Sequence, residues 1–121
     1  MYRVCVRRHF DAAHALRGYR GKCENMHGHR WEVVVCASSD ELDHLGMAVD
    51  FGVLKGALDA ILEELDHHCL NDTPPFDAIN PSSEHIAKMV FERMQADLPE
   101  VRLEYVEAWE SPDAWATYCP A

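Results

Sequence analysis

The sequence predicts an α+β fold in which a four-stranded antiparallel sheet carries two helices on one face. Alternating or β-branched apolar runs occupy both ends of the chain, and apolar residues recur at helical spacing in the middle. The outer runs are joined by short or loop connections, so the order β-β-α-α-β-β packs most simply with both helices on one side of the sheet. At 121 residues the whole chain, 1–121, fits one domain.

The first two strands are predicted from their apolar patterns. Residues 2–10 alternate between apolar and polar side chains, which is typical of a half-buried strand. Residues 31–38 are apolar or β-branched on both faces, so this strand is expected to be covered on both sides. Residues 17–29 between them contain three glycines and are expected to form a loop.

Two helices are predicted next. The first spans about 51–68 with Asp50 as its cap, and its apolar residues are Phe51, Leu54, Leu58, Ile61, Leu62 and Leu65. Residues 71–81 contain three prolines and must form a loop. Ser82 or Ser83 then caps a second helix, which ends at the next proline. Its apolar residues are Ile86, Val90, Met94 and Leu98.

The last two strands are predicted at 101–110 and 114–119, joined by a turn at 111–113. In the first of them one side carries Val101, Leu103, Tyr105 and Trp109, and the other side carries Val106 and Ala108. Neither side is therefore expected to be fully solvated. We expect the sheet face away from the helices to be covered by other copies of the chain.

Composition narrows the class of function. The net charge is -10, with 21 acidic against 11 basic residues, which argues against nucleic acid and anionic membrane surfaces and favours a small polar substrate. The apolar stretches fall short of the about 20 residues that span a bilayer. Five scattered cysteines without an apolar leader predict a reducing, cytoplasmic location. Three of them, Cys5, Cys36 and Cys119, are expected to be small buried hydrophobic residues.

The stretch "CENMHGH", residues 23–29, is the first candidate site. His27 and His29 are separated by one residue and therefore project to the same side of an extended backbone, while Gly28 lets that backbone bend. A closed structural zinc site needs four ligands, usually with CxxC pairs, and the chain has no such pair. Three histidines with one open position would instead suit a catalytic ion.

The third histidine is predicted to be His14. It lies at the far end of the first strand, where an antiparallel partner that begins near residue 29 would run beside it. His9 and His44 are alternatives without a comparable geometric argument. Cys23 is either a fourth ligand, which would make the site structural, or a reactive thiol beside the ion. A third interpretation has the histidines simply hydrogen-bonded in a turn.

Asp66 and His67, at the end of the first predicted helix, form a second candidate site. They are either a solvated helix end, with histidine favoured by the helix dipole, or an acid/base pair for proton transfer near neutral pH. Neighbouring residues of a regular helix diverge by roughly 100°. The two side chains can therefore converge only where the helix frays, or they act on a substrate together.

Five motifs occur together in the chain, namely "FDAAHAL", "CENMHGH", "LDHHCLND", "NPSSEH" and "AWES". By their order and spacing the chain resembles the 6-pyruvoyl-tetrahydropterin synthase family of tunnelling-fold enzymes over nearly its whole length. The cysteine four residues before the first histidine of "HGH" is most similar to the bacterial branch, the 6-carboxy-5,6,7,8-tetrahydropterin synthases of the queuosine pathway.

The resemblance implies a zinc site and a set of proton-transfer groups. The positions that match the zinc (Zn2+) ligands are His14, His27 and His29. The positions that match the catalytic thiol and its partner pair are Cys23, Asp66 and His67.

The resemblance also implies substrate contacts. Glu110 matches the carboxylate that anchors the pterin ring, and Ser82 and Ser83 fall on the segment that contacts it. Ser82 stands where the family usually has threonine, which retains the hydroxyl group. Cys69 stands where bacterial members often have tyrosine, a change that the sequence does not explain. Candidates for holding the triphosphate are Arg17, Arg20 and Lys22.

The implied reaction is the zinc-dependent conversion of 7,8-dihydroneopterin triphosphate to 6-carboxy-5,6,7,8-tetrahydropterin, with loss of triphosphate and acetaldehyde. The implied assembly is a trimer that closes a barrel, with two trimers stacked into a homohexamer. One rival is the same fold acting as a 6-pyruvoyl-tetrahydropterin synthase. Another is a non-catalytic, oligomeric zinc-binding module with Cys23 as the fourth ligand.

Overall fold

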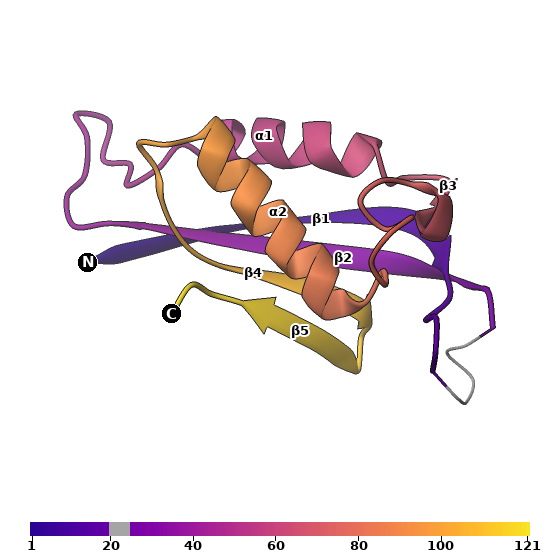
Figure 1. Ribbon diagram of the computed structural model, residues 1–121. Helices are drawn as coiled ribbons and strands as arrows, with labels where there is room; N and C mark the ends of the chain where they lie inside the picture. Colours follow the sequence, from indigo (N-terminus) through magenta and orange to yellow (C-terminus); the bar gives the residue numbers. More distant parts are fainter. Residues whose placement is uncertain (20–24) are drawn as a thin grey trace.

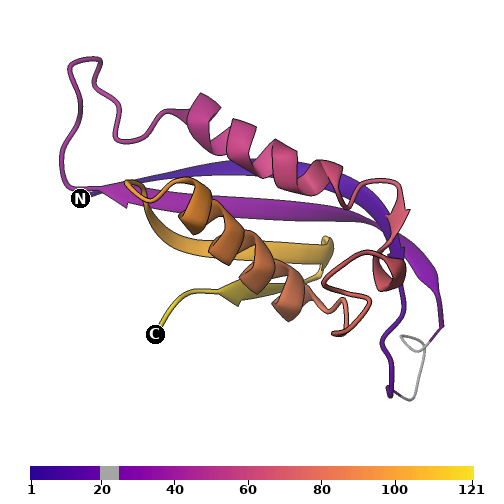
Figure 2. The ribbon, with the colours of Figure 1, turned by 45° about the horizontal axis from the view of Figure 1, so that its top comes forward.

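The computed structural model describes residues 1–19 and 25–121, which form one sheet with two helices on the same face (Figures 1 and 2). The elements in chain order are β1 (Tyr2–His14), β2 (His27–Ser39), α1 (Phe51–Glu63), β3 (His68–Cys69), the short 3-10 helix η2 (Leu70–Asp72), α2 (Ser83–Asp97), β4 (Arg102–Ser111) and β5 (Ala114–Tyr118). This arrangement confirms the α+β prediction.

The sheet has five strands in the order β3-β1-β2-β4-β5. The four longer strands β1, β2, β4 and β5 pair with one another in antiparallel fashion, as predicted. The sequence analysis missed β3, a two-residue strand that pairs in parallel with Ala12 and Ala13 of β1. A strand of this length has no periodicity to detect.

The β1–β2 hairpin is longer than predicted. β1 continues beyond residue 10 to His14, and β2 begins at His27, inside the expected loop. His14 therefore lies directly opposite His27, and Gly28 lies opposite Ala13 as an ordinary strand residue. A Cβ atom at Gly28 would meet no described atom within 4 Å. The bend that was expected at this glycine is therefore not required.

Helix α1 begins where predicted and ends earlier. The carboxylate of Asp50 accepts a hydrogen bond from the backbone N–H of Gly52 at 2.7 Å, which caps the helix. Helix α1 ends at Glu63 instead of residue 68, although Leu65 in the following turn is still buried. Phe51 was expected in the core, but it is 51% exposed because it lies in the first turn, outside the buried stripe.

Helix α2 follows the prediction closely. Ser82 is its cap and accepts a hydrogen bond from the N–H of His85 at 3.2 Å. The helix ends at Asp97, two residues before Pro99, and it buries Ile86, Val90 and Met94 against the sheet. Within residues 1–19 and 25–121, no helix is both long and apolar enough to cross a membrane.

A bulge in β4 decides which side chains face the helices. Tyr105 lies opposite Cys36 of β2, but Leu103 lies opposite Ala37, so Glu104 is an extra residue. Leu103 is therefore buried on the helix side with Val106 and Ala108, whereas the sequence pattern had placed it with Tyr105. The prediction that side chains alternate without interruption along β4 was therefore wrong at Glu104.

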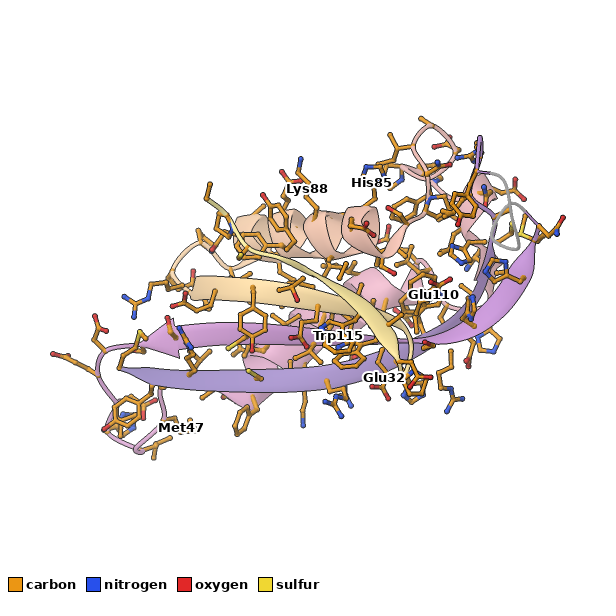
Figure 3. The ribbon with its side chains drawn as sticks, turned by 90° about the horizontal axis from the view of Figure 1, so that it is seen from below. Glu32, Met47, His85, Lys88, Glu110 and Trp115 are labelled. Atoms are coloured by element: carbon orange, nitrogen blue, oxygen red, sulfur yellow. The ribbon has the colours of Figure 1, made fainter. Side chains whose placement is uncertain are left out.

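We call the sheet face away from the helices the open face; Figure 3 looks onto it, with Glu32 and Trp115 labelled (Figure 3). Trp115 of β5 is 51% exposed and stacks on Trp109 of β4 at a ring-centroid distance of 3.9 Å. Cys36 is fully buried, as expected. The same expectation was wrong for Cys5 and Cys119, which are both exposed.

Candidate metal centre

Three histidine rings meet at the end of the β1–β2 hairpin. His14 is opposite His27 in the ladder, and His29 lies two residues further along β2 on the same face. The ring centroids of His14 and His27 are 4.6 Å apart, those of His27 and His29 are 4.5 Å apart, and those of His14 and His29 are 5.4 Å apart. The structure thus brings together the three histidines that the sequence analysis selected, while His9 and His44 lie outside this group.

The carboxylate of Glu110, near the end of β4, completes the group. Its Oε1 atom lies 2.9 Å from Nε2 of His14, 3.0 Å from Nε2 of His29 and 3.5 Å from Nε2 of His27. One oxygen atom is therefore within reach of all three Nε2 atoms, so these nitrogens converge on one point. We call these four residues the His/Glu cluster.

Backbone carbonyl groups fix the orientation of two rings. Nδ1 of His14 lies 2.8 Å from the carbonyl oxygen of Pro81, and Nδ1 of His27 lies 2.6 Å from that of Asn25. A carbonyl oxygen can only accept, so each Nδ1 carries the hydrogen. In the neutral ring Nε2 is then unprotonated and presents a lone pair, as metal-ligating histidines do.

The arrangement inside the cluster calls for a cation. An unprotonated Nε2 atom and a carboxylate oxygen at 2.9 Å would repel one another unless a proton or a metal ion lay among them. In addition, Nε2 of His29 is buried and has no hydrogen-bond partner of acceptable geometry among the described residues. The four residues therefore fit a metal ion.

The electrostatics of the cluster favour the forms that bind metal. Burial, together with the nearby His27 and His14, lowers the pKa of His29 in spite of the opposing charge of Glu110. Burial alone would raise the pKa of Glu110, but with protonated histidine rings the hydrogen bond from His14 and the positive charges of these rings outweigh it and lower that pKa. A metal ion among the Nε2 atoms would supply this positive charge in place of the protons. An unprotonated imidazole and an ionised carboxylate are the required ligand states.

The donor set limits the kind of ion. Three imidazole nitrogens and one carboxylate oxygen suit zinc and several other first-row divalent ions, and they are a poor match for calcium, which prefers oxygen ligands only. The cluster is partly exposed, since the side chains of His27 and Glu110 are 28% and 26% accessible. A ligand can therefore reach it from solvent.

Asp66 and His67 form a separate group. Oδ2 of Asp66 lies 2.9 Å from Nδ1 of His67. The two side chains converge because α1 has already ended and His67 has a φ of 59°, in the left-handed region. The sequence analysis expected the two side chains to diverge because it placed them in a regular helix. Helix α1 ends at Glu63, before either residue, so that expectation does not apply.

The backbone of β1 holds this pair in place. The N–H of Asp11 donates to Oδ1 of Asp66 at 2.9 Å, and the carbonyl oxygen of Asp11 accepts from the N–H of His67 at 2.6 Å. The hydrogen bond from Asp11, with a further contribution from His67, lowers the pKa of Asp66. Asp66 is thus ionised at neutral pH and able to orient the ring of His67, whose side chain is 77% exposed.

The remaining sequence candidates have different outcomes. Cys23 lies outside the described residues, as do Arg20 and Lys22. Ser82 caps α2 and Ser83 is its first residue, and they directly follow Pro81, whose carbonyl group holds His14.

Arg17 has a role that the sequence analysis did not foresee. Its guanidinium group donates to the carbonyl oxygens of Asn71, Phe76 and Ile79 and so ties down the loop before α2. These hydrogen bonds make Arg17 a structural residue. The carbonyl groups of Pro81 and Asn25 were missed as well, and no side-chain signal could have revealed them.

The fold and the His/Glu cluster define an α+β protein with a candidate metal centre at the end of its sheet. The family model for 6-pyruvoyl tetrahydropterin synthase matches residues 3–121. The chain therefore belongs to the 6-pyruvoyl tetrahydropterin synthase family, and the predictions that it is a member and an enzyme of the lyase class are confirmed.

Individual relatives agree with this assignment. The chain is 38% identical over 115 residues to a 6-carboxy-5,6,7,8-tetrahydropterin synthase of Synechocystis sp., covering 90% of this chain and 86% of that protein. It is 35% identical to a dihydroneopterin monophosphate aldolase of Pyrococcus furiosus, covering 89% of each. The structure of the Caenorhabditis elegans 6-pyruvoyl tetrahydropterin synthase matches with a TM-score of 0.84 at 29% identity, over 100% of this chain and 98% of that one.

Proposed function

We propose that this enzyme is a zinc-dependent lyase that converts 7,8-dihydroneopterin triphosphate to 6-carboxy-5,6,7,8-tetrahydropterin, releasing triphosphate and acetaldehyde, in queuosine biosynthesis. The observation that carries the proposal is the convergence of three Nε2 atoms on one point in a chain of this family. The identity to the carboxytetrahydropterin synthase of Synechocystis sp. supports the choice of product.

In this proposal His14, His27 and His29 hold the zinc ion. When bound, zinc acts as a Lewis acid that acidifies the side-chain hydroxyl groups of the substrate and the carbons beside them. The carbonyl groups of Pro81 and Asn25 keep the Nε2 atoms of His14 and His27 directed at the ion. The ring orientation is thereby set before the substrate arrives.

Proton transfer is assigned to Cys23, Asp66 and His67. Cys23, as the thiolate, removes a proton from the substrate side chain, and a nearby cation favours the thiolate form. His67 exchanges the complementary proton through Nε2, because its Nδ1 atom is engaged by Asp66 at 2.9 Å. Ionised Asp66 stabilises the protonated ring of His67.

Recognition of the pterin ring is assigned to Glu110, Ser82 and Ser83. The ionised carboxylate of Glu110 can accept two hydrogen bonds from the ring N–H and amino groups, which a neutral side chain could not match. The two serines at the start of α2 directly follow Pro81, which binds His14, and would offer hydroxyl groups to the ring. This pairing would fix the orientation of the substrate side chain over the ion.

We further propose that residues 1–121 act as one tunnelling-fold domain in the cytoplasm, assembled as a homohexamer of two stacked trimers. The open face supports this part of the proposal. It carries the stacked pair of Trp109 and Trp115, the latter 51% exposed, which a neighbouring copy would cover.

Three other functions compete with the main proposal. The same site could release 6-pyruvoyl-tetrahydropterin, and the Pyrococcus furiosus relative supports an aldolase acting on a dihydroneopterin phosphate. The non-catalytic zinc module differs in class, because it requires Cys23 to bind the ion. In that case Cys23 should resist alkylation until the metal is chelated.

One product assay separates these functions. Zinc-loaded protein is incubated with 7,8-dihydroneopterin triphosphate, and the products are identified by mass spectrometry. We expect 6-carboxy-5,6,7,8-tetrahydropterin together with acetaldehyde and triphosphate. The pyruvoyl product, or glycolaldehyde triphosphate from an aldol cleavage, would assign the chain to a rival branch, and a lack of any turnover would favour the module.

The role of Cys23 leads to the first mutational prediction. Cys23→Ala should retain the metal and the fold and lose turnover, because the base is removed while the three imidazoles remain. General base catalysis typically contributes about 100- to 10,000-fold, so a loss of that size is expected in kcat. Cys119→Ala, which removes an exposed thiol, is the matched control. Full activity in Cys23→Ala would exclude the thiol from the mechanism.

A further inference from the structure

Two cysteines and a tyrosine form a row across the open face, outside the His/Glu cluster and the Asp66 turn. Cys5 of β1 lies directly opposite Cys36 of β2, and Cys36 lies directly opposite Tyr105 of β4. The hydroxyl oxygen of Tyr105 is 3.8 Å from Sγ of Cys5. Neither the family match nor the proposed reaction gives this row a role.

The hydrogen bonds of Asp11 show which kind of cross-strand pair the two cysteines form. In an antiparallel ladder, opposed residues alternate between pairs that exchange hydrogen bonds and closer pairs that do not. Both backbone groups of Asp11 bond to Asp66 and His67, away from β2, so Asp11 belongs to a non-hydrogen-bonded pair. The register runs unbroken along β1, and Cys5 lies an even number of residues from Asp11, so it belongs to a pair of the same type.

This pairing suits a disulfide bond. The Cα atoms of a non-hydrogen-bonded pair are about 4.5 Å apart. Disulfide bonds span Cα distances of about 4.4–6.8 Å. Both thiols also lie on the open face, so Cys5 and Cys36 can be joined with little movement of β1 or β2.

The two thiols differ in accessibility. Cys5 is exposed, whereas Cys36 is fully buried. Burial raises the pKa of the Cys36 thiol to about 11, and the neighbouring Cys5 adds to this shift. A small oxidant in solution would therefore meet Cys5 first, while Cys36 remains a protonated thiol directly beside it.

We propose that Cys5 and Cys36 form a reversible oxidation site at which a hydroperoxide joins β1 to β2 through a disulfide bond. Cys5 loses its proton and the thiolate attacks hydrogen peroxide, so an S–O bond forms, the O–O bond breaks and hydroxide leaves. The hydroxide takes up the proton that Cys5 lost and becomes one molecule of water. The sulfur of Cys36 then attacks the sulfenic acid of Cys5, an S–S bond forms, and the proton of Cys36 leaves with the hydroxide as a second water. Two thiols lose two electrons and the peroxide gains them.

The test is a peptide map after oxidation. Reduced protein is treated with hydrogen peroxide, the remaining thiols are alkylated with iodoacetamide, and the protein is digested with trypsin. Cleavage after lysine and arginine places all five cysteines in different peptides, with Cys5 in residues 4–7 and Cys36 in residues 31–55. We expect these two peptides joined, two hydrogens lighter than their sum, and separated again by dithiothreitol.

Variants make the result specific. Cys5→Ser, at an exposed position, should abolish the joined peptide and leave Cys36 alkylated. Cys119→Ser should leave the joined peptide unchanged, because this exposed thiol lies outside the pair. Two results would overturn the proposal: Cys5 found as sulfinic or sulfonic acid while Cys36 stays free, or Cys5 joined to another cysteine or to a second chain.

Discussion

Two histidines of the His/Glu cluster, His14 and His27, are each held by a hydrogen bond at Nδ1. The carbonyl groups of Pro81 and Asn25 bind Nδ1 of His14 and His27, so Nε2 of each ring is directed inward. The three histidines could be predicted because identical side chains at strand spacing share a face. The two carbonyl groups could not, because every residue has one and only the fold determines which of them a ring meets.

His27→Ala should remove the metal. It eliminates one of three imidazoles and leaves too few nitrogen ligands for tight binding. Metal content of the purified variant is measured by atomic emission, with His44→Ala as the control because His44 was the sequence alternative and lies outside the cluster. Unchanged zinc content in His27→Ala would mean that other residues hold the ion.

Glu110→Gln distinguishes a pterin anchor from a metal ligand. The amide retains the shape of the side chain and loses the charge, and hydrogen bonds to charged groups contribute about 1.5–3 kcal/mol. We expect full metal content with kcat/KM reduced by about 10- to 100-fold. Glu107→Gln on the same strand, where the carboxylate accepts from Nε1 of Trp109, is the control. If Glu110→Gln loses the metal, the carboxylate is a ligand.

At the scale of elements, the sequence predicted where the helices begin better than where α1 ends. Both helix starts were correct because Asp50 and Ser82 have side chains that cap a helix. The end of α1 was placed too late, since Leu65 continues the apolar pattern although the backbone has already turned. The side of Leu103 was wrong because the bulge at Glu104 depends on pairing with β2, which local alternation does not encode.

Ser82→Ala should destabilise the protein without unfolding it. It leaves the N–H of His85 at the start of α2 without its side-chain acceptor. Loss of such a cap costs about 1 kcal/mol in the free energy of unfolding, which urea denaturation can measure. Ser82→Thr restores the residue usual in the family and should remain close to the parent. Equal midpoints for Ser82→Ala and the parent would show that the cap contributes nothing to stability.

At the scale of the whole molecule, the sheet leaves much of its two edges without a partner strand among the described residues. Strand β3 pairs with β1 only at Ala12 and Ala13, so most of the outer edge of β1 has no partner strand among residues 1–19 and 25–121. Strand β5 forms the other edge of the sheet. Exposed edges and the exposed aromatic side chain of Trp115 on the open face favour association with further copies.

The mass of the assembly in solution tests the proposed homohexamer directly. Sedimentation equilibrium should give six times the 13.8 kDa of the chain, with trimers appearing on dilution. Association is expected because covering the part of the open face around Trp115 removes this apolar side chain from water. A single species of 13.8 kDa at micromolar concentration would contradict this assembly.

The pairing of β1 with β2 sets His14 opposite His27 and so fixes where two rings of the His/Glu cluster lie. Backbone pairing fixes the positions of the rings, while their orientation also depends on Asn25, whose carbonyl group holds His27, and on Arg17, which ties down the loop that leads to Pro81. Deleting one residue within either strand would instead turn every later side chain to the opposite face. Designers who wish to graft new substrate contacts onto this scaffold should therefore preserve both strands together with Arg17 and Asn25.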